Sequence, residues 1–509
     1  MVEKTKSQFD DDFFRSGFHG FDQMEKEFRA DGWHYARASD YVEDKGEIIR
    51  GQPHNCLVSN ETACWALGPF LINYLIKDSA IVCHGPAGCS SYWYGILGLY
   101  GPKVMVSTQL NERDAILGGG EKLQATLREV LRDHKPGMIA VVETCVSCIT
   151  KDDLEGICSE LGQESGVPII PFSGSGFRYP VWVVGFEEAF NHIIDLMKPA
   201  KEKNERSINF INSPLVFHWR AFFEIMPYLQ RLGIRINTHG FNFINFQDLL
   251  ERFPKGALNV TRCSGQGMQT IEYAEKVLDI PYVRVPTPLS IKYTEQFIWK
   301  IADFFGLGNE AEILIHEEKE KIAPRIERAH SYLQGKRVAI SAASGKNIAL
   351  AQMAAELGME VVYMGLYKTD PLFHDLLREW LHDTGQDPEV QGEMSNYEVE
   401  ACMYRLKPDF YWGIAEDRTP IGRTPTLCVD HLGITMNQQH FGFEGAAFFA
   451  EYLVDLQENR LLKNWGHYLQ PYFPQLAGDR YLAASPLATK PCPKKAQGSK
   501  LKAQSSDQP

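Results

Sequence analysis

Short apolar runs alternate with longer amphipathic segments through most of the chain. The first series spans about 61–201 and includes helical spacing over 121–133. A second series begins at 207–211, and a third at 336–340. Alternation of strand and helix patterns is typical of right-handed βαβ units and parallel sheets. The pattern therefore predicts an α/β protein with three doubly wound parallel-sheet domains.

The same pattern predicts where the domains begin and end. Residues 1–50 show no clear periodicity and are expected to form an irregular arm that packs on a larger body. The charged segment 310–334 is predicted to be a helical connector with a kink or break at Pro324. The lysine-rich end of the chain is expected to be disordered. The predicted parts are the N-terminal arm 1–50, the domains 51–205, 206–330 and 331–484, and the tail 485–509.

Several predicted strands end at a thiol or an imidazole. In open α/β sheets, ligands bind at the carboxyl ends of the strands. A lone cysteine is more often a buried core residue than a ligand, so it is the repeated placement that indicates a site. The residues concerned are Cys83 and Cys89 after 79–82, Cys145 after 138–142, Cys263 after 258–261, and Cys428 and His431 after 424–427.

Composition narrows the class of protein. The 509 residues are 44% hydrophobic and 23% charged, which is typical of a globular chain. A net charge of −13 argues against a nucleic-acid binder, whose affinity depends on basic side chains. The stretch 63–76 is too short and too interrupted to span a membrane, and 1–30 lacks the apolar core of a signal peptide, so a cytoplasmic protein is expected.

The eleven cysteines indicate thiol chemistry rather than disulfides. An odd number scattered through a long chain fits thiolate ligands or buried thiols better than a disulfide framework. Neither a Walker-type phosphate loop nor a Gly-x-Gly-x-x-Gly fingerprint follows a predicted strand, so a nucleotide site is not expected on this chain.

In a set of short motifs the chain resembles the large subunits of nitrogenase component 1 and their relatives. The likeness covers about 55–460, and it implies three Rossmann-like domains, in agreement with the alternation above. The motifs are Thr62-Ala63-Cys64, His84-Gly85-Pro86-Ala87-Gly88-Cys89, Glu112-Arg113-Asp114-Ala115-Ile116-Leu117-Gly118-Gly119, Cys145 with Asp152-Asp153, Gly176-Phe177-Arg178, Cys263 with Ile280-Pro281, and Phe441-Gly442-Phe443-Glu444-Gly445.

The resemblance implies an interface cluster. Cys64, Cys89 and Cys145 match the family's ligands of an 8Fe-7S cluster, which is shared with a homologous β-type (K-like) subunit in an α2β2 heterotetramer. Thiolates from separate loops can hold one face of such a cluster. The alternative is three buried thiols. Cys148 lies outside the family pattern and is a further possible ligand.

The resemblance also implies a second, catalytic cluster of the nitrogenase 8Fe-9S-C type, with its heterometal and organic acid left open. Cys263 matches the thiolate at one end of that cluster, and His431 the imidazole at the other end, with His440 as the alternative. A histidine before a helix is otherwise usually structural. Lys346 stands in 344–347, where the family has an arginine-rich loop beside the cofactor.

Two departures from the family concern the substrate. Trp182 and Phe186 stand where dinitrogen reductases have a glutamine and a histidine, and Ile96-Leu97 replaces a pair of arginines. Apolar groups in place of hydrogen-bond donors suit a bulkier, less polar substrate. The alternative is that both aromatic residues belong to the core.

With these departures the chain is most similar to the catalytic D subunits of nitrogenase-like methylthio-alkane reductases. This resemblance implies reductive cleavage of carbon–sulfur bonds with release of methanethiol. It also implies that an ATP-dependent iron–sulfur reductase homodimer supplies single electrons. Three alternatives stay open: a dinitrogenase α subunit, a scaffold for cofactor assembly, and a dark-operative tetrapyrrole reductase.

Overall fold

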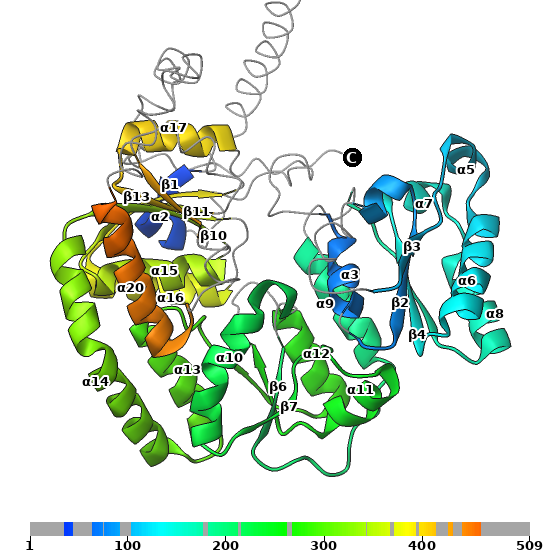
Figure 1. The fold of residues 1–509 in the computed structure, drawn as a ribbon, viewed down its shortest axis with the longest axis horizontal. Coiled ribbons are helices and arrows are strands. Elements are labelled where there is room, and N and C mark those ends of the chain that lie inside the picture. Colours follow the sequence, from blue (N-terminus) through cyan, green and yellow to red (C-terminus); the bar gives the residue numbers. More distant parts are fainter. Residues whose placement is uncertain are drawn as a thin grey trace, which may run out of the picture.

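The described residues form three units, each built on a mainly parallel sheet (Figure 1). The prediction of an α/β fold with doubly wound parallel sheets is confirmed. Among the helices that are described, none is long and apolar enough to cross a membrane. The computed structural model describes residues 35–43, 64–74, 76–91, 103–176, 182–211, 215–261, 267–342, 344–366, 371–392, 396–413, 426–430 and 440–459.

The first unit is a parallel sheet with helices on both faces. Its strands, in spatial order, are β3 (Met105–Ser107), β2 (Ser79–His84), β4 (Met138–Glu143) and β5 (Ile169–Phe172). One face is covered by α3 (Leu67–Tyr74) and α9 (Trp182–Ile194), and the other by α6 (Gly120–His134) and α8 (Leu154–Ser165). Two short helices, α5 (Glu112–Leu117) and α7 (Cys145–Thr150), lie together at one end of this unit (Figure 1).

Glycines let α3 and α9 pack in close contact. A Cβ added to Gly68 of α3 would clash with the backbone nitrogen of Phe186, and one added to Gly185 of α9 would clash with the carbonyl oxygen of Trp65. Backbones can approach this closely only where no side chain stands between them. The contact fixes the position of α9, which carries Trp182 and Phe186.

The second unit shares its core with the first. Phe190 of α9 packs on Phe241 with ring centroids 3.8 Å apart, and also contacts Phe253. The strands of this unit, in spatial order, are β7 (Arg235–Thr238), β6 (Ser207–Phe210), β8 (Leu258–Thr261) and β9 (Tyr282–Arg284). Its helices are α10 (Leu215–Arg231), α11 (Phe246–Arg252), the 3₁₀ turn η4 (Phe253–Lys255) and α12 (Met268–Leu278).

The third unit contains the largest sheet in the described part of the chain. Its strands, in spatial order, are β1 (Tyr35–Arg37), β12 (Glu389–Gly392), β11 (Glu360–Leu366), β10 (Arg337–Ala342), β13 (Phe410–Gly413) and β14 (Leu427–Asp430). All neighbours are parallel except β1, which runs antiparallel to β12. The helices are α2 (Ala38–Glu43), α15 (Ser344–Glu356), α16 (Pro371–Thr384), α17 (Asn396–Leu406) and α20 (Gly442–Glu458).

The described part of the predicted N-terminal arm is regular rather than irregular. β1 adds an edge strand to the third sheet, and α2 packs on α16. Asp387 fixes the joint, because its carboxylate accepts the backbone N–H and the hydroxyl of Ser39 at 2.9 and 3.0 Å. The arm is therefore ordered by pairing with a strand about 350 residues away in the sequence. The predicted tail, 485–509, lies outside the described residues.

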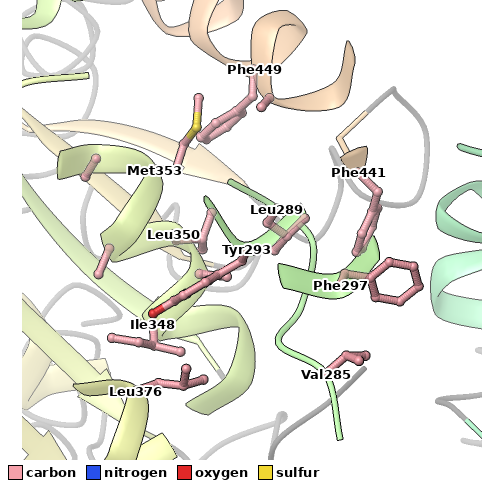
Figure 2. Close-up of a cluster of buried hydrophobic side chains, with 14 of the residues drawn as sticks. Val285, Leu289, Tyr293, Phe297, Ile348, Leu350, Met353, Leu376, Phe441 and Phe449 are labelled. Atoms are coloured by element: carbon pink, nitrogen blue, oxygen red, sulfur yellow. The ribbon is translucent and has the colours of Figure 1, made fainter. Parts of the chain in front are cut away.

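The helical connector packs on the third unit. It corresponds to α14 (Gly308–Leu333), which runs beside α20, and the preceding helix α13 (Ile291–Phe304) packs on the same unit (Figure 1). Figure 2 shows Tyr293 and Phe297 of α13 in one buried cluster with Leu350 of α15 and Phe449 of α20. The predicted break at Pro324 is wrong, since α14 continues through it. Residue 320, whose carbonyl loses its helical partner there, is exposed and can bond to water instead.

Candidate functional site

Two of the predicted cluster cysteines follow neighbouring strands of the first sheet. β2 ends at His84 and leads to Cys89, and β4 ends at Glu143 and leads to Cys145. His84 and Glu143 are register partners. The chain winds from β2 to β3 on one side and continues to β4 and β5 on the other, so β2 and β4 flank the topological switch point of the sheet. That is where ligands bind in doubly wound folds.

Hydrogen bonds fix the loop of Cys145 to the end of β2. Thr144 caps α7, and its backbone N–H donates to the Ser147 hydroxyl at 2.9 Å. The hydroxyls of Thr144 and Ser147 both donate to the carbonyl oxygen of His84, at 3.0 and 2.7 Å. Because these groups are buried, each bond replaces one that water would otherwise supply. The helix that begins with Cys145 is therefore held to β2.

Cys64 and Cys145 meet beside Gly176. A Cβ added to Gly176 would lie 3.0 Å from the Cβ of Cys64 and 3.5 Å from the sulfur of Cys145. Cys89 sits in a tight turn in which its N–H donates to the carbonyl of Pro86 at 3.1 Å. All three cysteines are half-buried, and Cys64 and Cys89 pack against the core under α3 and α9. The structure thus brings thiols from three separate loops to one end of the first unit.

Other cysteines of this unit have different surroundings. Cys83 is fully buried, and its pKa is raised by burial and by the neighbouring thiols of Cys89 and Cys64. Burial raises the pKa of Cys158, on the opposite face of the sheet, to about 12. Cys148 is half-buried, one turn after Cys145 on α7. Neutral buried thiols such as Cys83 and Cys158 are poor metal ligands, because the thiolate is the binding form.

The three thiols of Cys64, Cys89 and Cys145 are the kind of ligand that holds an iron–sulfur cluster. Among the described residues, no three His, Cys, Asp or Glu side chains lie close enough together to hold one metal ion. A cluster with several irons spreads its ligands over a wider area. The partial exposure of Cys64, Cys89 and Cys145 leaves their outer side accessible to a second chain. These residues therefore fit the interface cluster that the family resemblance implies.

Cys263 and His431 lie outside the described residues, and the structure describes the strands that lead to them. Cys263 follows β8, which pairs with β6 and β9, and His431 follows β14. Gly267, four residues after Cys263, is described and has a left-handed φ of 80°. Its N–H donates to the Oε1 of Glu187 at 2.9 Å. Glu187 belongs to α9 and is 4% exposed, so this buried bond ties α9 to the N-cap of α12.

The two aromatic residues of the predicted substrate wall differ in exposure. Trp182 is half-buried at the start of α9, and its ring meets Phe186 edge-on with centroids 6.1 Å apart. Phe186 is 1% exposed and also contacts Phe190 in the shared core. The burial of Phe186 favours the core role that the sequence left open. Trp182 is the more exposed of the two.

Lys346 and His440 lie close together in the third unit. Lys346 is half-buried in the first turn of α15, and His440 immediately precedes Phe441, the N-cap of α20. The His440 ring is fully buried, and neither of its nitrogens has a hydrogen-bond partner among the described residues. Burial, together with the charge of Lys346, lowers the pKa of His440 to about 3. The imidazole is therefore neutral and keeps a lone pair for a ligand or a proton.

Three polar residues position these segments, and the sequence predicted this role for none of them. Glu187 holds Gly267, as described above. The Oε2 of Glu224 accepts the backbone N–H groups of His440 and Phe441 at 3.1 and 2.7 Å. Asp152 accepts a bond from buried His84 at 2.9 Å. Asp152 belongs to the motif after Cys145. Glu187 and Glu224 belong to no motif, and their hydrogen-bond partners are far away along the chain.

Known proteins are similar to this chain over most of its length. The sequence pattern of the nitrogenase component 1 type oxidoreductases matches residues 64–458. A nitrogenase iron-molybdenum cofactor biosynthesis protein NifE from Clostridium pasteurianum is 27% identical over 416 residues, which cover 79% of this chain and 88% of that protein. A nitrogenase molybdenum-iron protein alpha chain from Methanothermobacter marburgensis is 23% identical over 398 residues, which cover 74% and 83%.

A solved structure shares the fold. The structure titled "Nitrogenase Cp1 at pH 5" matches with a TM-score of 0.68 at 20% identity, over 82% of this chain and 93% of its own. At this identity the match shows the fold alone. The family pattern, however, spans well over half of the 509 residues. The chain therefore belongs to the nitrogenase component 1 type oxidoreductases.

Proposed function

We propose that this chain is the catalytic, α-type subunit of a nitrogenase-like reductase that cleaves the carbon–sulfur bond of methylthio-alkanes. The observation that carries the substrate class is the position of Trp182. It lies on α9, and Glu187 of the same helix holds the segment that follows Cys263. The helix that carries this half-buried indole is thus bonded to Gly267, four residues after the predicted cofactor ligand Cys263. Dinitrogen reductases have an amide at the corresponding place.

The interface cluster would be held by Cys64, Cys89 and Cys145 together with ligands from a β-type subunit. Membership of the family supports iron–sulfur clusters in this chain. When bound, such a cluster supplies storage and transfer of single electrons. The chain contributes three thiolates on loops that are braced by the end of β2 and by Gly176. The same cluster would join the two subunits in an α2β2 assembly.

The catalytic cofactor would be held by Cys263 and by His431, with His440 as the alternative ligand. When bound, it supplies the electrons for reduction. The Lys346 ammonium can hold an anionic group or deliver a proton at its Nζ, because Lys346 is half-buried and close to His440. The Trp182 ring excludes water and packs against alkyl carbons, which contributes roughly 25 cal/mol per Å² of apolar area removed from water.

The overall reaction balances with reducing equivalents from the partner reductase. A methylthio-alkane R–S–CH3 takes up two electrons and two protons. The R–S bond breaks, and R–H and CH3S–H form. Where dinitrogen reductases have an amide, Trp182 offers mainly an apolar ring face, and a polar group left unsatisfied against that face would cost about 1–3 kcal/mol. The wall therefore favours a thioether over dinitrogen.

An exposed apolar patch next to Cys145 suits the docking of the reductase. Ile116 and Leu117 of α5 are 81% and 71% exposed, and Ile149 of α7 is 68% exposed. The two helices pack together, and α7 begins at Cys145. Grouped large apolar side chains on a surface mark interaction sites. We call Ile116, Leu117 and Ile149 the docking surface. Because electron transfer slows steeply with distance, a donor that binds here is well placed for the interface cluster.

A competition experiment tests the proposed substrate. The complex is supplied with its reductase, ATP and dithionite, and methanethiol from a methylthio-alkane is measured alongside ammonia from dinitrogen. We expect methanethiol release, and we expect it to fall selectively in Trp182→Gln. Phe186→Leu is the matched control, because it changes the buried member of the aromatic pair and leaves Trp182 in place. Ammonia without methanethiol would overturn the proposal.

A cofactor-assembly scaffold is the second candidate, because the relative from Clostridium pasteurianum is described as a cofactor biosynthesis protein. A scaffold holds its cluster transiently and passes it to another protein. Iron is therefore quantified before and after incubation with a cofactor-free nitrogenase component 1. Transfer of iron and activity to that acceptor would favour the scaffold, and retention with methanethiol release would favour the reductase.

A further inference from the structure

A buried histidine–aspartate pair joins the elements that carry the docking surface to the end of β2. His84 is fully buried, and its Nε2 lies 2.9 Å from the Oδ2 of Asp152. The other carboxylate oxygen of Asp152 accepts the backbone N–H of Gly119 at 2.8 Å. The hydroxyl of Thr150, the last residue of α7, donates to Oδ2 at 3.0 Å. One carboxylate therefore contacts β2, α7 and the turn after α5.

The hydrogen bonds fix the tautomer of His84. A carboxylate only accepts, so Nε2 of His84 carries the proton and donates to Asp152. Nδ1 then accepts from the hydroxyl of Thr108, 3.1 Å away. That hydroxyl oxygen accepts the backbone N–H of Gly85 at 3.0 Å. Burial lowers the pKa of His84 despite the nearby Asp152, which agrees with a neutral ring.

The turn after α5 is shaped to contact this pair. Gly118 has a φ of 93°, which favours glycine, and its N–H closes α5 on the carbonyl of Asp114. A Cβ added to Gly119 would lie 3.0 Å from the Cε1 of His84 and would clash with Leu110. The two glycines thus let the backbone approach the imidazole, directly after the exposed Ile116 and Leu117.

The carbonyl of His84 completes the connection to the cluster loop. It accepts the hydroxyls of Thr144 and Ser147, the residues on either side of Cys145 and Val146. A continuous set of buried hydrogen bonds therefore runs from Gly119 through Asp152 and His84 to the start of α7. Buried networks whose members are all satisfied are rigid.

We infer that His84 and Asp152 are positioning residues that hold the docking surface at a set distance from Cys145, so that the electron from a docked reductase reaches the interface cluster. This inference rests on the proposed function for the presence of the reductase. It assigns neither residue a contact with the cluster or the substrate. It adds the requirement that weakening the His84–Asp152 bond slows electron transfer from the reductase but not from a small reductant.

The test compares two routes of electron delivery in the assembled complex. Asp152→Asn keeps the shape of the side chain and removes the charge that accepts from His84. The rate at which the reductase with ATP reduces the interface cluster is measured, as is the rate with dithionite alone. We expect the reductase-driven rate to fall about tenfold or more, since small misplacements of reacting groups are costly. The dithionite rate and the iron content should stay unchanged.

Asp153→Asn is the matched control. Asp153 is the neighbouring carboxylate, caps α8 by accepting the N–H of Gly156 at 2.9 Å, and is not part of the link. Asparagine is also a good cap, so this variant should behave like the parent protein in both assays.

Thr150→Val is the second variant, in case Asp152→Asn assembles poorly. It removes one bond to Asp152 and keeps the carboxylate. We expect faster amide hydrogen exchange at Gly119 and in α7 together, with a smaller selective loss of the reductase-driven rate. Equal rates in parent and variants, or equal losses by both routes, would overturn the inference and leave the proposed function standing. A parent complex that accepts no electrons from the reductase would overturn both.

Discussion

The backbone N–H of Gly267 lies 2.9 Å from the Oε1 of Glu187, a carboxylate that is 4% exposed. This bond joins two segments that are 80 residues apart in the sequence. Gly267 lies four residues after Cys263 and is the N-cap of α12, while Glu187 belongs to the helix of Trp182. One buried contact therefore joins the helix of the predicted substrate wall to Gly267, four residues after the predicted cofactor thiolate.

Replacing this carboxylate should weaken the catalytic site selectively. In Glu187→Ala the N–H of Gly267 loses its acceptor, which costs about 1–3 kcal/mol for a buried group. We expect a lower melting temperature and less iron at the Cys263 site, with the signal of the interface cluster retained. Glu187→Gln keeps an acceptor oxygen and should retain most of both. Full iron content in Glu187→Ala would show that the contact does not support the site.

The close contact of α3 and α9 predicts a second effect. A Cβ on Gly185 would clash with the carbonyl oxygen of Trp65, so Gly185→Ala should destabilise the chain by about 1–3 kcal/mol. Gly162 in α8 is the matched control, because the nearest atom to its added Cβ is 3.4 Å away. Gly162→Ala should be neutral or stabilising by about 0.5–1 kcal/mol. Urea unfolding of both variants measures the difference, and equal stabilities would contradict the packing argument.

The interface cluster should depend on Cys89. Cys89→Ala should lower the iron content and weaken the α2β2 assembly, because a cluster shared between chains also joins them. Cys158→Ala is the control, since Cys158 is buried on the opposite face of the sheet. Iron analysis and analytical ultracentrifugation measure both effects. An unchanged assembly with full iron in Cys89→Ala would remove this cysteine from the ligand set.

The alternation of apolar runs predicted the three sheets because buried parallel strands are continuously apolar. β2 and β4 are both buried along their whole length, and their sequences are accordingly among the apolar runs that predicted the first sheet. The pairing of β1 with β12 was not predictable, since three residues carry no period and their partner is about 350 residues away. The break predicted at Pro324 was wrong because the carbonyl of residue 320, which loses its helical partner, is exposed and can bond to water.

Some site residues could be predicted from the sequence, whereas the contacts that hold them could not. The strand ends predicted Cys89 and Cys145, and the structure shows that they follow neighbouring strands. The core position of Phe186 had a signal, because Val183, Phe186 and Phe190 follow the apolar spacing of a helix. Trp182 lies at the edge of that stripe. Contacts such as the bonds of Glu187 and Glu224 had no signal, since they are made between segments far apart in the sequence.

The buried imidazole of His440 predicts a pH dependence. Its pKa is about 3 in the folded chain, whereas an unperturbed imidazole has a pKa of 6.5. Between these values the unfolded chain binds a proton that the folded chain does not, so stability falls as the pH drops below 6.5. We expect up to about 1.4 kcal/mol of loss per pH unit. Urea unfolding at several pH values should show a shallower loss in His440→Phe.

His316→Gln is the control for this titration, because His316 is exposed on α14. It should follow the parent protein. A His440→Phe variant with the same pH dependence as the parent would show that the ring is stabilised by a group outside the described residues.

The last prediction separates the two clusters. Cys263→Ala should abolish substrate reduction, because it removes the thiolate expected to hold the catalytic cofactor. The interface cluster uses Cys64, Cys89 and Cys145, so its low-temperature electron paramagnetic resonance signal should remain. His431→Ala and His440→Ala, compared in the same assay, distinguish the two candidate imidazole ligands: the true ligand should lose catalytic iron, whereas the other should keep it. Persisting activity in Cys263→Ala would mean that the catalytic cofactor is bound elsewhere, and loss of both signals would mean that the two sites are not independent.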